Sequence, residues 1–258
     1  MVNNVNIGDY VDYKSTPNSY TSLVDYNGYS NQTFTSNEST KWQVLSKDGN
    51  NICLISEQSI KTDNNTELSF SGKTGYLNGV KELNNICNIY GKGYGALTAR
   101  SLSADDIIKL LCTSGVTTPD IIDTSVFPSG IDFFDNSGNP TTKIYRNYSN
   151  YYDSYKTMNT TSLEYQLIFL SNNKYEENHS ISWLATQAQN INETGCWYSL
   201  FEAYYFPNTS FHYCINGHHL YAANLETITR SSQIRPIVIL RADLKAAGQD
   251  EMGTWLIQ

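Results

Sequence analysis

The chain has 258 residues, of which 40% are hydrophobic, and this supplies enough apolar material for the core of a single β-rich domain. Its formal net charge is −8 and no cluster of Lys and Arg interrupts the acidic character, which argues against nucleic acid as a partner. No apolar run approaches the roughly 20 residues of a membrane span, which argues against membrane insertion.

Tyrosine and asparagine take the place of charged residues, which make up only 16% of the chain. With 20 tyrosines, the composition is typical of recognition surfaces, where Tyr offers a rigid amphipathic contact at low entropic cost. Codon bias in an AT-rich genome enriches Tyr and Asn as well, although Lys is not unusually common here. The composition leaves both explanations open.

The N-terminal part predicts mainly β-structure. Residues 6–13 alternate as in a short strand, and the polar residues 14–40, with recurring aromatic side chains, predict an extended surface loop. Residues 41–46 and 52–56 are apolar runs that flank an Asp48-Gly49 turn, and glycine supplies the positive φ that such turns need. We therefore expect a β-hairpin.

Two helices are predicted next. Residues 72–76 indicate a turn, after which the apolar residues follow the spacing of an amphipathic helix: Val80, Leu83, Ile86, Cys87 and Tyr90. Gly91 and Gly93 end this helix. Ser103 is the expected N-cap of the second helix, with Asp106 at its N3 position.

Residues 113–180 carry several Pro and Gly and a run of tyrosines, and they predict a long insertion on the core of a single domain, 1–258. Within it, only 165–170 indicates a regular element, either strand or helix. Further strands are predicted at 181–185, 198–204, 219–222, 234–240 and, after a turn at 248–253, at the C-terminal end. The unbroken apolar run 237–240 indicates a strand buried on both faces.

Five cysteines without a CxxC spacing do not indicate a disulfide framework. Cys53, Cys87 and Cys112 lie in apolar surroundings, which favours reduced, buried thiols. A bridge between Cys196 and Cys214 stays open. The first eight residues have no basic or apolar leader region, so we expect either a virion protein released at lysis or a chain whose leader was removed.

Catalytic and metal-binding patterns are weak. The cluster His212, Cys214, His218 and His219 has ligand types that suit zinc but a spacing that matches no standard site. Among the carboxylate pairs, Asp105/Asp106 are best explained as helix capping, and Asp132/Asp135 and Glu176/Glu177 as solvated loop charges. No nucleophile elbow or phosphate loop is present. We therefore predict no catalytic residue, metal or cofactor.

The remaining feature is a concentration of aromatic residues between two predicted core strands. Exposed aromatic rings beside Asn and Ser stack on sugar rings and anchor protein interfaces. The predicted ligand-binding residues are Trp197, Tyr198, Tyr204, Tyr205, Phe211, Tyr213 and Tyr221. Some of these positions would instead pack the domain, whereas Trp42 and Trp183 are expected in the core.

The order of the elements resembles the C-type-lectin-like domains of phage-encoded and surface proteins in AT-rich Gram-positive bacteria. The resemblance rests on the segments 7–11, 42–45, 75–84, 99–102, 182–185 and 234–238. It implies an α+β, β-rich fold: a C-type-lectin-like core with two helices and long loop insertions. The Glu-Pro-Asn or Gln-Pro-Asp and Trp-Asn-Asp triplets of calcium-dependent lectins are missing, so calcium-mediated sugar binding is not implied.

The resemblance implies a non-enzymatic binding or display module on a virion or at the cell surface, such as a phage tail or receptor-binding protein. Its partner would be a glycan or protein receptor on a bacterial surface, or other virion subunits, and a homo-oligomer stays open. One alternative is a purely structural decoration or tail-tip protein. The other is an enzyme of the formylglycine-generating or glycan-hydrolase kind, the former relying on Cys196 and Cys214.

Overall fold

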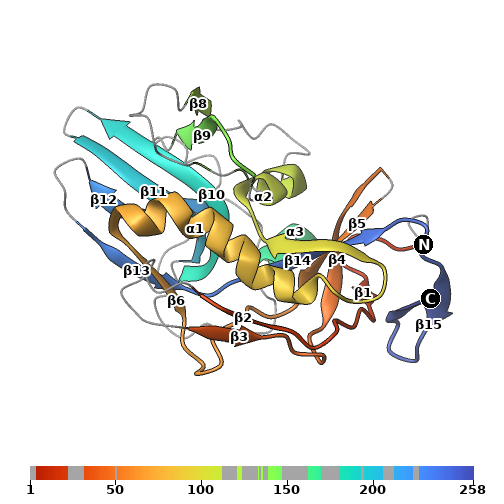
Figure 1. The fold of residues 1–258 in the computed structure, drawn as a ribbon. Helices are drawn as coiled ribbons and strands as arrows, with labels where there is room; N and C mark the ends of the chain where they lie inside the picture. The colour runs from red at the N-terminus through yellow and green to blue at the C-terminus, as the bar shows by residue number, and fades with distance from the viewer. Residues whose placement is uncertain are drawn as a thin grey trace.

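The fold is known from a computed structural model, which describes residues 4–22, 32–49, 51–111, 121–123, 133, 135, 139–146, 162–169, 180–192, 195–205, 212–222 and 227–258 (Figure 1). Within these ranges the chain is a strand-rich mixture of α and β structure, as the sequence predicts. Helix α1 crosses the middle of Figure 1, with strands β10 to β12 on one side and β1, β4, β5 and β14 on the other.

One sheet has seven strands in the order β15-β16-β1-β4-β5-β14-β7. Their bounds are β1 (Tyr10–Val11), β4 (Trp42–Asp48), β5 (Asn51–Ser56), β7 (Ala96–Ser101), β14 (Pro236–Arg241), β15 (Ala246–Gln249) and β16 (Trp255–Ile257). All neighbours are antiparallel except β1 and β16, which are parallel. The predicted β4–β5 hairpin is confirmed, and Gly49 in its turn has a φ of +53°.

A second sheet has five strands in the order β12-β11-β10-β9-β8. Their bounds are β8 (Ile121–Asp123), β9 (Lys143–Arg146), β10 (Ser180–Asn192), β11 (Gly195–Tyr205) and β12 (His212–Ala222). Two of these strands come from the predicted insertion 113–180, and β9 pairs in parallel with β10. The described parts of that region therefore extend a sheet of the core.

Two small sheets complete the strands. They pair β2 (Ser19–Thr21) with β3 (Thr33–Thr35), and β6 (Leu68–Ser71) with β13 (Thr229–Ser232). The prediction of a loop throughout 14–40 is therefore wrong for β2 and β3. Phe34 explains the difference, because its ring is buried in the core and anchors β3.

The helices are α1 (Gly72–Cys87), continued by a 3-10 turn η2 (Asn88–Tyr90), α2 (Ala104–Leu111) and α3 (Leu163–Phe169). Both predicted helices form, but α1 begins at Gly72, so the turn predicted at 72–76 is wrong. Gly75 and Gly79 are both buried in α1, and at Gly79 the absence of a side chain allows close packing that outweighs its poor helix propensity. The regular element predicted at 165–170 is the helix α3.

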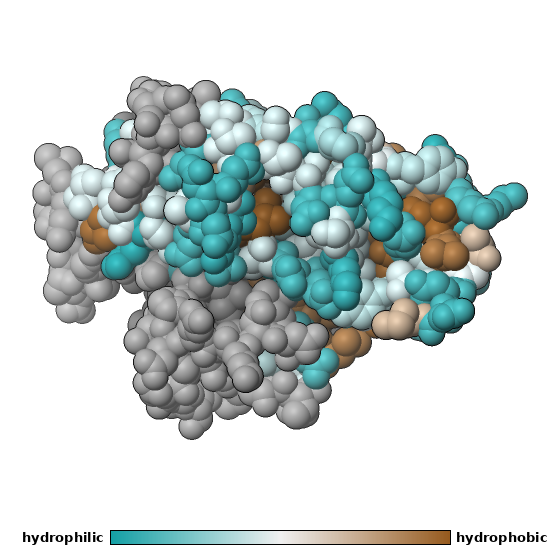
Figure 2. Space-filling view, turned by 90° about the horizontal axis from the view of Figure 1, so that it is seen from below, coloured by the Kyte–Doolittle hydropathy of each residue, from teal (hydrophilic) through white to brown (hydrophobic). Residues whose placement is uncertain are grey.

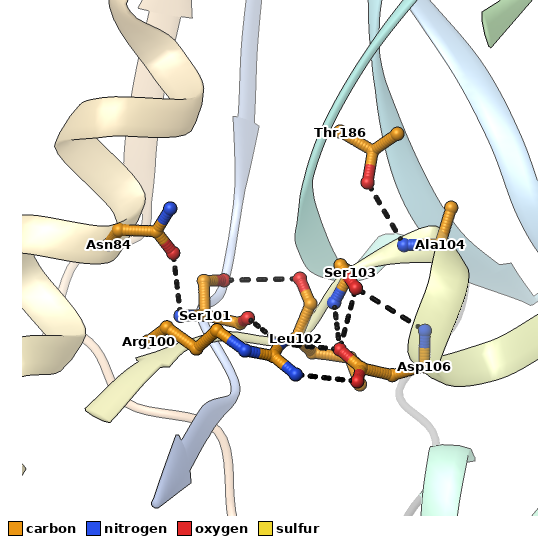
Figure 3. A network of polar contacts seen from close by, with 8 residues as sticks. All are labelled: Asn84, Arg100, Ser101, Leu102, Ser103, Ala104, Asp106 and Thr186. Carbon is orange, nitrogen blue, oxygen red and sulfur yellow. Dashed lines mark hydrogen bonds and ion pairs between the residues drawn. The ribbon is translucent and has the colours of Figure 1, made fainter. Parts of the chain in front are cut away.

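The start of α2 is held by the predicted capping box (Figure 3). The backbone N–H of Asp106 donates to Ser103 Oγ over 3.3 Å, and the backbone N–H of Ser103 donates to Asp106 Oδ2 over 2.9 Å. Arg100 of β7 donates two hydrogen bonds of 2.6 and 2.7 Å to the same carboxylate. One carboxylate thus caps α2 and ties it to the edge of the seven-stranded sheet.

Apolar side chains form two clusters on opposite faces of the central strands. Alternate residues of β4, β5 and β14 belong to different clusters, for example Val238 to one and Ile237 to the other. Helix α1 and Trp183 pack in the first cluster, whereas α2 and α3 pack in the second. This confirms that β14 is buried on both faces and that Trp42 and Trp183 are core residues.

Arg235 joins the second cluster to the rest of the fold without reaching solvent. Its guanidinium donates to the carbonyl oxygen of Ser56 at the end of β5, and to the carbonyl oxygens of Leu167 and Ile168 in the last turn of α3. The C-terminal end of a helix carries partial negative charge, which compensates a buried cation. Arg235 therefore has a structural role.

Candidate functional site

A polar groove with a volume of about 590 Å³ opens on the surface between two loop segments. Its lining is formed by Thr35, Asn37, 39–41, 57–63, Asn65 and Tyr90. Hydroxyl, amide, ammonium and carboxylate groups predominate among these side chains. Figure 2 views the molecule from the side on which β2 and β3 lie in Figure 1, and its coloured atoms are mostly hydrophilic with separate apolar patches.

The segment 57–65 forms one wall of the groove, and backbone hydrogen bonds hold it at three points. Glu57 N–H donates to the Lys41 carbonyl over 2.8 Å at the start of the wall. Ile60 and Ile234 exchange two hydrogen bonds as an isolated bridge, and Asp63 N–H donates to the Thr33 carbonyl of β3. The wall is therefore fixed against both the core and the opposite side of the groove.

The tip of this wall is a tight turn between Thr62 and Thr66. Asn65 N–H donates to the Thr62 carbonyl over 2.8 Å, and the two threonine hydroxyls lie 2.6 Å apart. Asn65 has a φ of +59°, a conformation that asparagine tolerates better than most residues. The Asn65 side chain is thereby presented at the groove by a locked backbone.

The floor of the groove is Tyr90, whose ring packs edge-on against Trp42 at a centroid distance of 5.4 Å. Its hydroxyl accepts a hydrogen bond of 3.3 Å from Asn37 N–H in the other wall. Burial raises the pKa of the Tyr90 hydroxyl, against the opposing effect of its hydrogen bond with Thr40. The floor is therefore a neutral phenol connected to the aromatic core.

Both carboxylates of the groove are held by hydroxyl groups. Tyr10 donates to Glu57 Oε1 over 2.6 Å, and Thr35 Oγ1 donates to Asp63 Oδ2 over 2.9 Å. Partial burial, together with the bond to Glu57, raises the pKa of Tyr10 to about 12, so this phenol remains a donor at neutral pH. The arrangement fixes the acceptor oxygens before any ligand binds.

The lining offers polar groups that can bind a polar ligand. The described lining residues include neither histidine nor cysteine, and the Thr35 hydroxyl is held as a donor to the Asp63 carboxylate. Converging donors and acceptors on a fixed backbone can instead match a ligand that carries many hydroxyl groups. Among the described residues no group of three or more His, Cys, Asp and Glu side chains could hold a metal ion.

Six of the seven aromatic residues predicted to bind ligand lie on strands, as expected for Tyr198, Tyr204 and Tyr221. Trp197, Tyr198, Tyr204 and Tyr205 belong to β11, and Tyr213 and Tyr221 to β12. The register pairs Tyr198 with Tyr221 and Tyr204 with Tyr213, so the backbone brings four tyrosines into two cross-strand pairs. Phe211 and the side chains of the other six lie outside what the structure describes.

The same register separates Cys196 from Cys214. Cys196 precedes Trp197, which pairs with Ala222, whereas Cys214 follows Tyr213, which pairs with Tyr204. At about 3.3 Å per residue the two positions lie on the order of 25 Å apart along the hairpin. A disulfide needs Cα atoms within about 7 Å, so this pair cannot be bridged within the chain.

Two other cysteines follow the prediction. Cys53 and Cys87 are free and buried, and burial raises the pKa of both thiols. Neither has the lowered thiol pKa that nucleophilic cysteines require. Cys112 lies outside the described residues.

The neighbouring carboxylates of α2 have different surroundings. Asp106 is the cap described above, as predicted, whereas Asp105 accepts a hydrogen bond from Tyr145 and lines a small cavity of about 140 Å³ with Asp135. Burial, and then the charge of Asp106, raise the pKa of Asp105. Asp132, the predicted partner of Asp135, and the pair Glu176/Glu177 lie outside the described residues, as do the side chains of the His212–His219 cluster.

No described helix is both long and apolar enough to span a bilayer. Comparison of the chain with protein-family models, with curated proteins and with solved structures finds no match. The polar groove and the aromatic hairpin β11–β12 are therefore the two candidate binding surfaces, and their interpretation rests on their own geometry.

Proposed function

We propose that this protein is a non-enzymatic binding or display module of the C-type-lectin-like kind, located on a virion or at a bacterial cell surface, that recognises a glycan. The observation that carries the proposal is the polar groove. Its fixed acceptors and donors suit a polyhydroxylated ligand, which offers both kinds of partner at every ring. A binding site that is already ordered loses little entropy when the ligand arrives.

The wider scaffold is consistent with this proposal. The segments that carry the resemblance lie in β1, β4, α1, the end of β7, and the strands around Trp183 and Val238, and most of their apolar side chains are buried. A packed core that supports polar surface segments is the arrangement expected of a display module.

A structural virion component is the second candidate, and one observation favours it. The edge strand β7 and the turn before it expose Leu97 and Tyr94, each more than half accessible. Exposed apolar side chains at a sheet edge are suited to contacts with neighbouring subunits. The third candidate, a formylglycine-generating enzyme, is disfavoured because Cys196 and Cys214 lie far apart on the hairpin.

The test is binding of the labelled, purified chain to intact Gram-positive cells and to their extracted wall polysaccharides. Saturable binding that the polysaccharide competes supports the proposal. Gln58→Trp, which fills the groove from an exposed position, should abolish this binding, whereas the matched change Gln249→Trp on β15 should leave it intact.

A second arm distinguishes the two surfaces. If Trp197→Ala combined with Tyr205→Ala abolishes binding and Gln58→Trp does not, the glycan binds at the aromatic hairpin and the groove assignment is wrong. If the unmodified chain binds no cell or wall fraction, the proposal fails and the structural role becomes the better one.

A further inference from the structure

We propose that the polar groove selects acidic saccharides, whose carboxylate or phosphate groups bind between Lys41 and Lys61. The inference deepens the proposed function and rests on it, since it concerns the ligand class of the same groove. It starts from the observation that both carboxylates of the lining accept hydrogen bonds from hydroxyl groups, whereas no described residue engages its two ammonium groups.

Both lysines line the groove, and they come from different segments of the chain. Lys41 precedes β4 in one wall and Lys61 lies in the segment 57–65 that forms the other. Both side chains are exposed. Within the described part of the chain, no hydrogen bond or ion pair engages either ammonium group.

Three other basic side chains of the described residues are paired with carboxylates, whereas exposed lysines outside the groove, such as Lys73 and Lys245, are not. Lys14 pairs with Asp12 at 2.9 Å, Arg241 with Asp243 at 3.2 Å, and Arg100 with Asp106 at 2.6 Å. In a chain with 25 acidic and 17 basic residues, acidic partners are plentiful. Two unengaged ammonium groups that face one cavity are therefore available for a ligand.

The carboxylates of the groove do not satisfy these lysines. Glu57 is bound by Tyr10 and Asp63 by Thr35, so each carboxylate already accepts a hydrogen bond from a neutral hydroxyl. An acidic group that enters between the walls can accept charge-assisted hydrogen bonds from both lysines, which are roughly twice as strong as bonds between neutral groups. The remaining amides and hydroxyls would contact the sugar ring.

The net negative charge of the molecule opposes the approach of acidic saccharides. At −8 the protein repels anions at long range, so preference for an acidic sugar must come from contacts inside the groove. Such contacts are partly exposed to solvent and are screened by salt. Binding of an acidic saccharide should therefore weaken as ionic strength rises, whereas binding of a neutral one should not.

The experiment uses wall polysaccharide from Gram-positive cells, separated by anion exchange into acidic and neutral fractions. The full chain should bind the acidic fraction about tenfold more tightly than the neutral one. Lys41→Gln and Lys61→Gln should each lower affinity for the acidic fraction roughly fivefold, as for loss of a partly exposed charge pair, and leave affinity for the neutral fraction unchanged. Lys245→Gln, which removes the same charge outside the groove, is the matched control and should change neither.

Two treatments of the acidic fraction identify its anionic group. Loss of binding after chemical reduction of the carboxyl groups assigns a uronic acid, and loss after removal of phosphate with hydrofluoric acid assigns a sugar phosphate. Equal affinity for the acidic and neutral fractions, or lysine variants that behave as wild type, would overturn this inference and leave the proposed function standing. Binding to neither fraction would overturn both.

Discussion

Arg235 shows how a single residue of this chain can couple distant segments. Its guanidinium has no exposed surface and donates four hydrogen bonds to three carbonyl oxygens, two of them in the last turn of α3. Arginine is suited to this position because its planar fork presents several donors in fixed directions, whereas lysine presents one charged point.

Replacing Arg235 with Met should lower the free energy of unfolding by about 3 kcal/mol or more, because three buried carbonyl groups lose their donors. Urea denaturation followed by tryptophan fluorescence measures the change. Arg241→Met is the control, because Arg241 is exposed in a surface pair with Asp243 and should contribute less than about 0.5 kcal/mol. Equal losses for the two variants would contradict the structural role of Arg235.

Asp105 and Asp106 show that adjacent residues of one type can have opposite electrostatics. Burial alone would raise the pKa of Asp106, but the charge of Arg100 and the hydrogen bonds from Arg100 and Ser103 outweigh it and hold the pKa below the ordinary 3.8. For Asp105, burial and the Asp106 charge both raise the pKa. The sequence pattern predicts the cap at Asp106. It does not predict the surroundings of Asp105, because the partner Tyr145 is 40 residues away along the chain.

Stability should depend on the ionisation of Asp106. Because its pKa is lower in the folded state, its contribution is present above about pH 4 and is lost as the pH falls through the folded-state pKa. Asp106→Asn should therefore reduce the free energy of unfolding by about 2 kcal/mol at pH 7, and the deficit should shrink below pH 4.

The measurement is urea denaturation of both proteins at a series of pH values between 7 and 2. Glu38→Gln, an exposed carboxylate outside the cap, should parallel the wild-type curve. A deficit for Asp106→Asn that is the same at every pH would show that the cap acts through shape and not through charge.

At the level of elements, α1 shows where local propensity fails. Glycines at 72 and 75 predict a turn, yet α1 begins at Gly72, and both glycines are buried, as is Gly79 further along the helix. A Cβ atom on Gly79 would lie 2.4 Å from Leu200 Cδ1, so the absence of a side chain lets α1 approach β11. This contact joins residues 121 positions apart, and for that reason no local pattern reveals it.

Gly79→Ala should lower the melting temperature although alanine favours helices. The propensity gain of roughly 0.5–1 kcal/mol should be outweighed by overpacking against the buried Leu200, which typically destabilises by about 1–3 kcal/mol. In a double-mutant cycle, Leu200→Ala should cost less stability in the Gly79→Ala background than in wild type. Additive effects would mean that the two residues do not compete for the same space.

The elements differ in how well the sequence predicts them. The β4–β5 hairpin, the capped helix α2 and the doubly buried β14 are predictable because their turn, cap and apolar patterns are local. Strands β8 and β9 are not, because they are short and gain stability only by pairing beside β10. The extent of β11 and β12 is likewise underestimated, since their polar residues interrupt the apolar alternation.

The whole molecule is organised around strands shared by two cores. Because β4, β5 and β14 supply side chains to both clusters, neither cluster can lose its packing while the other keeps these strands. The polar groove is built on the same framework through Trp42 and Tyr90. The residue types that line the groove are common throughout the chain, so the sequence pattern does not reveal it. The groove forms through long-range backbone bonds at Ile60 and Asp63.

Unfolding should accordingly be one cooperative transition for both cores. Cys87 belongs to the first cluster and Cys53 to the second, so each thiol reports on one of them. Peptide mapping after pulsed alkylation in urea should give the same midpoint for the two cysteines. A midpoint for Cys53 well below that of Cys87 would show that the cores unfold separately.

The parallel pairing of β1 with β16 has a mechanical consequence. Tension that pulls the chain apart along these two strands would load the Asp12–Trp255 backbone bond and the indole bond from Trp255 to Asp9 together, in shear. The contact spans one residue pair, Val11 with Trp255, so it would yield early and release β15 and β16 as slack. The groove takes no lining residue from β15 or β16, and its one link to β1 is the Tyr10 bond to Glu57, so a molecule stretched in this way would lengthen by the C-terminal strands before its binding surface lost its shape.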